Sequence, residues 1–111
     1  MPSENKHTLG TFEHALENLR NNVMMMASQT ERSLNRALKG LMERDDKISA
    51  LAIADDEEID QLEKQIDKEG IDLLLRFQPV ASDLRRVVSA MKLSSNLERI
   101  AELWALHAKQ A

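Results

Sequence analysis

The sequence predicts an all-α fold, an up-down-up three-helix bundle of long antiparallel helices. Glycine and proline are scarce, with three and two in 111 residues. The composition is 42% hydrophobic and 31% charged, and it is rich in leucine, alanine, glutamate and lysine, which is typical of long helices. Apolar residues recur at steps of three and four in successive stretches, with brief interruptions near Asp45 and Pro79. Such short connections make neighbouring helices antiparallel.

The first helix is expected to begin at Leu9, after a polar segment from Met1 to Thr8 that we expect to be flexible. Residues 9–111 then form a single domain. The apolar spacing indicates a heptad-like seam on a helix of about 30 residues. The seam consists of Phe12, Leu16, Leu19, Val23, Met26, Leu34, Ala37 and Leu41, with Thr30 filling its one gap.

The second helix is expected to follow Arg44-Asp45-Asp46, because aspartate can accept the unpaired backbone donors at a helix start. Asp55 stands where the seam of this helix requires an apolar residue. Gly70 weakens the helix interior by about 1 kcal/mol, and we therefore expect it to pack closely against a neighbouring backbone. The seam positions are Ile48, Ala52, Asp55, Ile59, Leu62, Ile66, Leu73 and Phe77.

The third helix is expected to start at Pro79, which disfavours helical geometry at Gln78 but suits the first turn of a new helix. Its core row is Val80, Leu84, Val87, Met91, Ser94, Glu98, Ala101 and Ala105, and Glu98 is the charged exception. A second stripe is formed by Leu93, Leu97, Ile100 and Trp104. A bundle of three helices leaves such a stripe partly exposed, which usually marks a contact surface.

Two acidic pairs carry the functional argument: Asp56 with Asp60, and Glu98 with Glu102. Each pair is spaced four apart, so both carboxylates lie on one face of their helix. A fold-back near Pro79 places Asp60 level with Glu98 and Asp56 level with Glu102. Like charges this close are unfavourable unless a cation or an arginine lies among them.

One interpretation of these residues is a cation site built only from oxygen ligands. Its ligands would be Asp56, Asp60, Glu98 and Glu102, with Asp55 or Glu31 as further candidates. Such a set suits Fe³⁺, Mn²⁺, Mg²⁺, Ca²⁺ or Zn²⁺.

The alternative interpretation is a solvated acidic face balanced by Arg99, Arg32 and Lys64. The turn near Asp45 also brings Arg36 to the level of the acidic residues, so an arginine could supply the missing charge.

The composition disfavours several classes of function. The net charge of −4 gives no reason to expect nucleic-acid binding, and the lack of cysteine removes thiolate metal sites. No apolar run reaches the roughly 20 residues that span a bilayer, so we expect a cytoplasmic protein without membrane insertion. There is no glycine-rich phosphate loop and no nucleophile with a histidine in reach, so we expect neither catalytic nor cofactor-binding residues and no enzyme.

The stretch Gln78-Pro79-Val80-Ala81-Ser82-Asp83-Leu84-Arg85-Arg86-Val87 resembles the PhoU family, as do Ile53-Ala54-Asp55-Asp56-Glu57-Glu58-Ile59-Asp60 and Asn96-Leu97-Glu98-Arg99-Ile100. The likeness extends from Phe12 to Glu102. It implies three-helix repeats that hold metal ions through acidic pairs. It also implies a negative regulator of the phosphate-starvation response, which links the high-affinity phosphate ABC transporter to its sensor histidine kinase.

Carried onto this chain, the family's metal-binding pairs are Asp56 with Asp60 and Glu98 with Glu102. The chain departs from the family pattern at Ala101-Glu102, where members often have Gly-Asp, and in having room for one repeat where members typically have two. We therefore expect a homodimer that reproduces the six-helix assembly. The competing hypotheses are a structural dimerisation module without metal, and a small metal-storage or carboxylate-bridged redox protein.

Overall fold

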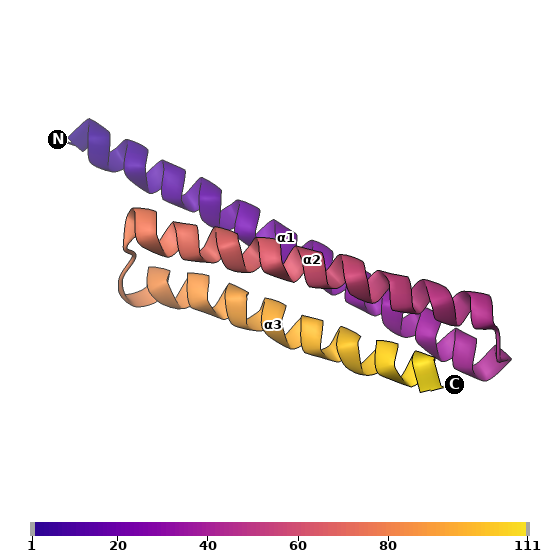
Figure 1. Ribbon diagram of the computed structural model, residues 1–111. Coiled ribbons are helices and arrows are strands. Elements are labelled where there is room, and N and C mark those ends of the chain that lie inside the picture. The colour runs from indigo at the N-terminus through magenta and orange to yellow at the C-terminus, as the bar shows by residue number, and fades with distance from the viewer. Residues whose placement is uncertain (1, 111) are drawn as a thin grey trace.

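The computed structural model describes residues 2–110, and it describes the side chains of residues 11–107. The chain forms three helices, α1 (Pro2–Glu43), α2 (Asp46–Phe77) and α3 (Ala81–Gln110). They run up, down and up along a rod of 63 × 18 × 17 Å, with α2 antiparallel to both neighbours (Figure 1). The predicted all-α three-helix bundle is therefore confirmed.

Helix α1 begins earlier than the expected start at Leu9. Its backbone is helical from Pro2, because proline suits the first turn of a helix and no glycine follows before Gly10. Met1 and the side chains of the other residues in the polar segment Met1 to Thr8 lie outside the described residues. The flexibility expected for that segment stays a prediction.

The turn between α1 and α2 is closed by Asp45, as expected. Its side chain accepts hydrogen bonds from the backbone N–H groups of Lys47 at 2.9 Å and Ile48 at 3.3 Å. Its own N–H donates to the carbonyl of Gly40 at 3.0 Å. Gly40 allows the two helices to approach closely here, because a Cβ at this position would lie 2.6 Å from Oγ and 3.1 Å from the backbone N of Ser49.

The fold-back between α2 and α3 occurs at Pro79, as predicted, but α3 begins at Ala81, two residues later than expected. Gln78 adopts a left-handed conformation with φ 44°, and its N–H donates to the carbonyl of Leu74 at 3.0 Å. After Pro79, the carbonyl of Val80 accepts the N–H of Asp83 at 3.1 Å. This reversal makes α2 and α3 neighbours along their length.

The core lies along the predicted seams, except at the start of the third row, where Val80 is 75% and Leu84 40% exposed instead of buried. Rings of Phe12 and Phe77 meet edge to face, 5.5 Å apart, at the end of the bundle nearest the second turn. Gly70 packs against the side chain of Met91, whereas we expected a neighbouring backbone. The main core cluster is Phe12, Leu16, Leu19, Val23, Met26, Ile59, Ile66, Leu73, Val87, Ala90 and Ala101.

Candidate functional site

Asp55, the charged exception in the α2 seam, is neutralised by arginine. It is buried between α1 and α2, with 5% of its surface exposed. Nη1 of Arg36 donates to both carboxylate oxygens of Asp55, at 2.9 and 2.8 Å. A buried carboxylate needs such a partner, because desolvation disfavours its charge. Asp55 therefore serves the packing of the bundle, and the expectation that arginine supplies the missing charge is met at this position.

Glu98, the charged exception in the α3 core row, has acidic neighbours instead. The side chain is half-buried. Burial, a hydrogen bond with Glu102, and the negative charges of Glu102, Glu63 and Asp60 together raise the pKa of Glu98 from 4.5 to about 7. Across the fold-back near Pro79, the charge of Asp60 on α2 is thus felt by Glu98 on α3. We call Asp60, Glu63, Glu98 and Glu102 the acidic cluster.

Glu63 belongs to this cluster although the sequence analysis did not name it. It is half-buried on α2, and its pKa is raised by burial first and then by Asp67, Asp60 and, less, Glu102. The spacing holds a signal that could have found it. Glu63 lies three residues after Asp60 and therefore on the same helix face.

One cation lies beside the cluster. Nζ of Lys64 is 3.3 Å from Oδ2 of Asp60, and both side chains are substantially exposed to solvent. An exposed pair of this kind contributes little, about 0–1 kcal/mol, so it does not offset the burial of Glu98.

Two other predicted ligands, Asp56 and Glu31, are not part of the acidic cluster as defined above. Asp56 is half-buried one turn before Asp60 on α2, and its Oδ1 is shielded from solvent. Glu31 is exposed on α1, in a shallow hollow that Arg32 and Lys39 also line.

The acidic cluster has the oxygen donors that a hard cation requires, but its geometry is not that of a closed ligand set. Among the side chains that the structure describes, no three histidine, aspartate or glutamate groups are gathered closely enough to hold a metal ion. The carboxylates therefore fit a cation by charge and donor type, and they would have to turn before they shared one ion.

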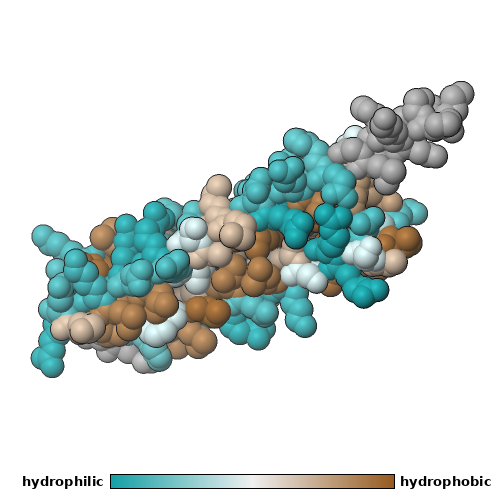
Figure 2. All heavy atoms as spheres, turned by 180° about the vertical axis from the view of Figure 1, so that it is seen from behind, coloured by the Kyte–Doolittle hydropathy of each residue, from teal (hydrophilic) through white to brown (hydrophobic). Residues whose placement is uncertain are grey.

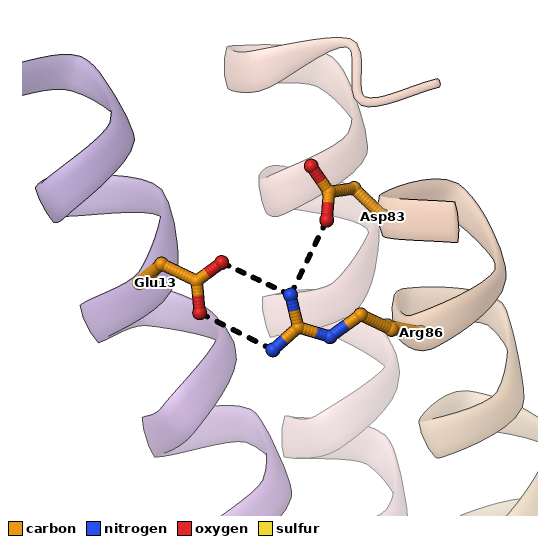
Figure 3. Close-up of polar contacts among 3 residues, drawn as sticks. All are labelled: Glu13, Asp83 and Arg86. Atoms are coloured by element: carbon orange, nitrogen blue, oxygen red, sulfur yellow. Dashed lines mark hydrogen bonds and ion pairs between the residues drawn. The ribbon is translucent and has the colours of Figure 1, made fainter. Parts of the chain in front are cut away.

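A second polar site joins α1 to α3 and lies within the Gln78 to Val87 stretch. Arg86 donates from Nη1 to Glu13 at 3.0 Å and to Asp83 at 3.2 Å, and from Nη2 to Glu13 at 3.2 Å (Figure 3). These hydrogen bonds lower the pKa of Glu13 and raise the pKa of Arg86. The bidentate pair fixes the height of α3 against α1.

Beside Arg86, the α1 and α3 helices enclose an open hollow of about 430 Å³. It is lined by Arg20, Val23, Met24, Arg85, Arg86, Ser89, Ala90 and Leu93. The second apolar stripe of α3 continues from this hollow. Leu93 is 48% and Ile100 is 42% exposed, while Leu97 and Trp104 are half-buried. The stripe is thus partly exposed, as predicted.

The family model described as "PhoU domain" matches residues 23–109. The chain belongs to the PhoU family. The match includes both acidic pairs, the fold-back near Pro79 and the exposed stripe of α3. The resemblance that the sequence motifs indicate is therefore confirmed.

Curated relatives support the same assignment. The chain is 34% identical to the phosphate-specific transport system accessory protein PhoU of Serratia marcescens, over 89% of this chain and 41% of the relative. It is 36% identical to the PhoU homolog of Pseudomonas putida, over 86% and 38%, and 33% identical to PhoU of Escherichia coli K12, over 89% and 41%. The chain thus spans about two-fifths of the length of these relatives.

No solved structure matches the chain. Within the part of the chain that the structure describes, no helix combines the length and apolar character needed to cross a bilayer.

Proposed function

We propose that this protein is a cytoplasmic, non-enzymatic regulator of phosphate uptake and phosphate-starvation signalling. It acts by binding protein partners, namely the phosphate ABC transporter and the sensor histidine kinase. Membership of the PhoU family carries this proposal, together with relatives that are named accessory proteins of phosphate-specific transport. The partly exposed apolar stripe of α3 supports a role in protein contacts.

The Gln78 to Val87 stretch offers exposed side chains for such a contact. Val80 is 75% exposed and Arg85 is also exposed, so neither is needed to fill the core. Capture of the tagged protein from phosphate-replete cells should recover the transporter or the kinase. The variants Val80→Glu and Arg85→Glu should recover less of them.

Met42→Glu is the matched control for this capture, because Met42 is 84% exposed and lies at the other end of the bundle. It should recover as much partner as the unmodified chain. Capture of neither transporter nor kinase by the unmodified chain would overturn the partner assignment.

We propose further that the acidic cluster, together with Asp56, binds a cation, with iron, manganese, magnesium, calcium or zinc as candidates. Burial raises the pKa of Glu98 and the neighbouring carboxylates raise it further, and a bound cation would neutralise the repulsion among these carboxylates. Titration calorimetry with each ion should show binding that is lost in Asp60→Asn combined with Glu98→Gln. Asp72→Asn, an exposed α2 carboxylate, should keep it.

The second candidate function is a structural helical-bundle module that pairs without metal. It is favoured by the observation that no three described carboxylate or imidazole side chains form a ligand set. A fold unchanged by Asp60→Asn with Glu98→Gln, and no ion bound at any concentration, would select this function. In either case we propose that the protein acts as a homodimer.

A further inference from the structure

We propose that the hollow between α1 and α3 binds an acidic amphipathic helix of a partner protein. Apolar side chains of this helix enter the hollow and continue along the second stripe of α3, and carboxylates at its acidic end pair with arginines at the rim. The proposal rests on the proposed function only in taking protein binding as the role of the chain. It adds the surface that is used and the chemistry of the segment that binds there.

Short side chains on α3 create the hollow. Ser89 and Ala90 leave a space of about 430 Å³ beside Val23 and Met24 of α1. The floor is apolar, because Val23 and Ala90 are 3% and 9% exposed. Pockets that bind ligands in proteins have volumes of about 300–1,000 Å³ and are mostly apolar, with a few polar groups that fix orientation. The hollow therefore suits apolar side chains of a bound segment.

The rim of the hollow is cationic. Among the described side chains, Arg20, Arg85 and Arg86 line it and no acidic residue does, although the chain has 19 acidic residues against 15 lysines and arginines. Arg86 is held by Glu13 and Asp83. Arg20 and Arg85 are exposed, and neither forms a hydrogen bond or an ion pair with another described side chain. Two guanidinium groups can therefore receive carboxylates of a partner.

Acidic side chains on α1 offset these charges only in part. Glu13 and Glu17 line a neighbouring hollow that shares Arg20 and Arg86 with the first. The pKa of Glu13 is lowered chiefly by the hydrogen bond from Arg86, and the charge of Arg20 has a smaller effect. Glu17 is exposed, so solvent screens its charge. The rim thus keeps an electrostatic preference for an acidic partner.

Charged and apolar side chains lie at opposite ends of this groove. Helices α1 and α3 run in the same direction (Figure 1), and on both of them the arginines come first. Arg20 lies about one turn before Met24, and Arg85 about two turns before Leu93. Met24 is 65% and Leu93 48% exposed, and the apolar stripe continues to Ile100. A complementary segment is therefore acidic at one end and apolar over the rest of its length.

A helix fits the length and shape of this groove. Arg86 and Ile100 are fourteen residues apart, which is about 21 Å along α3, and a partner helix of similar length spans the same distance. Grooves between helices hold a further helix through apolar anchors at i, i+3, i+4 and i+7. Seen from behind, where α1 lies in front of α2, apolar side chains form a band along the molecule between hydrophilic ones (Figure 2).

Two synthetic peptides of about 16 residues test the hollow directly. One has glutamates in its first two turns, followed by leucines at i, i+3, i+4 and i+7, and the other has glutamines in place of the glutamates. In fluorescence anisotropy, the glutamate peptide should bind the unmodified chain about tenfold more tightly than the glutamine peptide. This difference should shrink as salt is raised from about 50 to about 500 mM, because exposed ion pairs are screened.

Substitutions at exposed positions locate the bound peptide without removing a core side chain. Arg20→Glu should raise the dissociation constant of the glutamate peptide about tenfold. Arg32→Glu, the same change further along α1 and outside the hollow, should leave it unchanged. Ser89→Trp fills the hollow, keeps every charge in place and should abolish binding. Ser95→Trp, on an exposed position of α3 outside the hollow, should not.

The proposal is rejected if the glutamate peptide does not bind, binds no more tightly than the glutamine peptide, or is insensitive to Arg20→Glu and Ser89→Trp. Each of these results leaves the partner assignment in place, because capture of the transporter or the kinase by the unmodified chain tests that assignment separately. Capture that falls with Arg85→Glu but not with Arg20→Glu or Ser89→Trp would also reject the hollow, and it would keep the Gln78 to Val87 stretch as the contact.

Sedimentation tests the other possible occupant of the groove, a second copy of the chain. Self-association that is unchanged in Arg20→Glu and Ser89→Trp, with peptide binding lost in both, supports the acidic helix as the occupant. Self-association that is weakened in both variants while the peptide still binds would assign the groove to the second copy and overturn the proposal.

Discussion

Two acidic residues, Asp55 and Glu98, interrupt otherwise apolar rows of the bundle, and the fold treats them differently. Asp55 receives both of its hydrogen bonds from one guanidinium, that of Arg36. Glu98 has Glu102, Glu63 and Asp60 as neighbours, and burial together with these carboxylates raises its pKa to about 7. The buried charge between α1 and α2 is thus neutralised by an arginine, whereas the carboxylates between α2 and α3 still repel one another.

This difference separates a structural charge from a functional candidate. A carboxylate that only supports packing is expected to have a complementary partner in the fold, as Asp55 has. Repulsion among neighbouring carboxylates raises their pKa and destabilises their ionised form, and a bound cation would remove that destabilisation. Substitutions at Arg36, Glu98 and Lys64 distinguish the two situations by their effects on stability.

The largest effect is expected from Arg36→Met. It leaves the buried carboxylate of Asp55 without its counter-ion and should lower the free energy of unfolding by about 3 kcal/mol in urea denaturation at pH 7. Arg76→Met is the matched control, because Arg76 pairs with Asp72 at 3.4 Å on the surface. It should change the stability by about 0.5 kcal/mol or less. Equal losses in the two variants would contradict the contrast.

Glu98→Gln should act in the opposite direction and depend on pH. The pKa of Glu98 is about 7 when folded, against 4.5 ordinarily. Between these values the folded state binds more protons, so stability falls as the pH rises. After allowance for solvent screening, glutamine should stabilise the fold by about 1 kcal/mol at pH 8 and by nothing near pH 4.

Thermal unfolding of Glu98→Gln at these two pH values checks this expectation, with the exposed Glu57→Gln as control. A gain that is equal at pH 4 and pH 8 would show that lost packing or polarity, and not charge, explains the variant.

A smaller effect is expected from Lys64→Met. Lys64 is the cation 3.3 Å from Asp60, and its loss leaves the cluster more negative. The pKa of Glu98 should rise further, and stability at pH 7 should fall by about 0.5 kcal/mol. Lys68→Met, on the same helix, should leave the pKa of Glu98 where it is. If the pKa of Glu98 were equal in the two variants, the charge of Lys64 would have no effect on the acidic cluster.

The sequence alone predicted most of the architecture, because the helical period and the turn residues are local signals. Asp45 closes the first turn and α2 ends before Pro79, as predicted, although Gln78 is left-handed and not extended as a residue before proline usually is. The start of α1 at Pro2 was missed, because the polar residues before Leu9 carry no seam. We expected Gly70 to pack against the backbone of a neighbouring helix, but it packs against the long side chain of Met91.

The acidic site was predicted only in part. Residue spacing gives the height of a side chain along the bundle, which placed Asp60 level with Glu98. It does not give the direction in which each carboxylate turns, so Glu63 was not named although it lies on the same face. The sequence also placed Arg36 at the height of the acidic residues, but it did not show which carboxylate this arginine would neutralise. The packing of α1 against α2 pairs it with Asp55.

A carbon-13 NMR titration of the Glu98 carboxyl group tests whether carboxylates of α2 and α3 lie close together. The structure predicts a pKa of about 7 in the intact chain. It also predicts a lower value when Asp60→Asn and Glu63→Gln remove the neighbouring charges of α2. A pKa near the ordinary 4.5 that does not respond to these substitutions would show that the carboxylates of α2 and α3 do not meet.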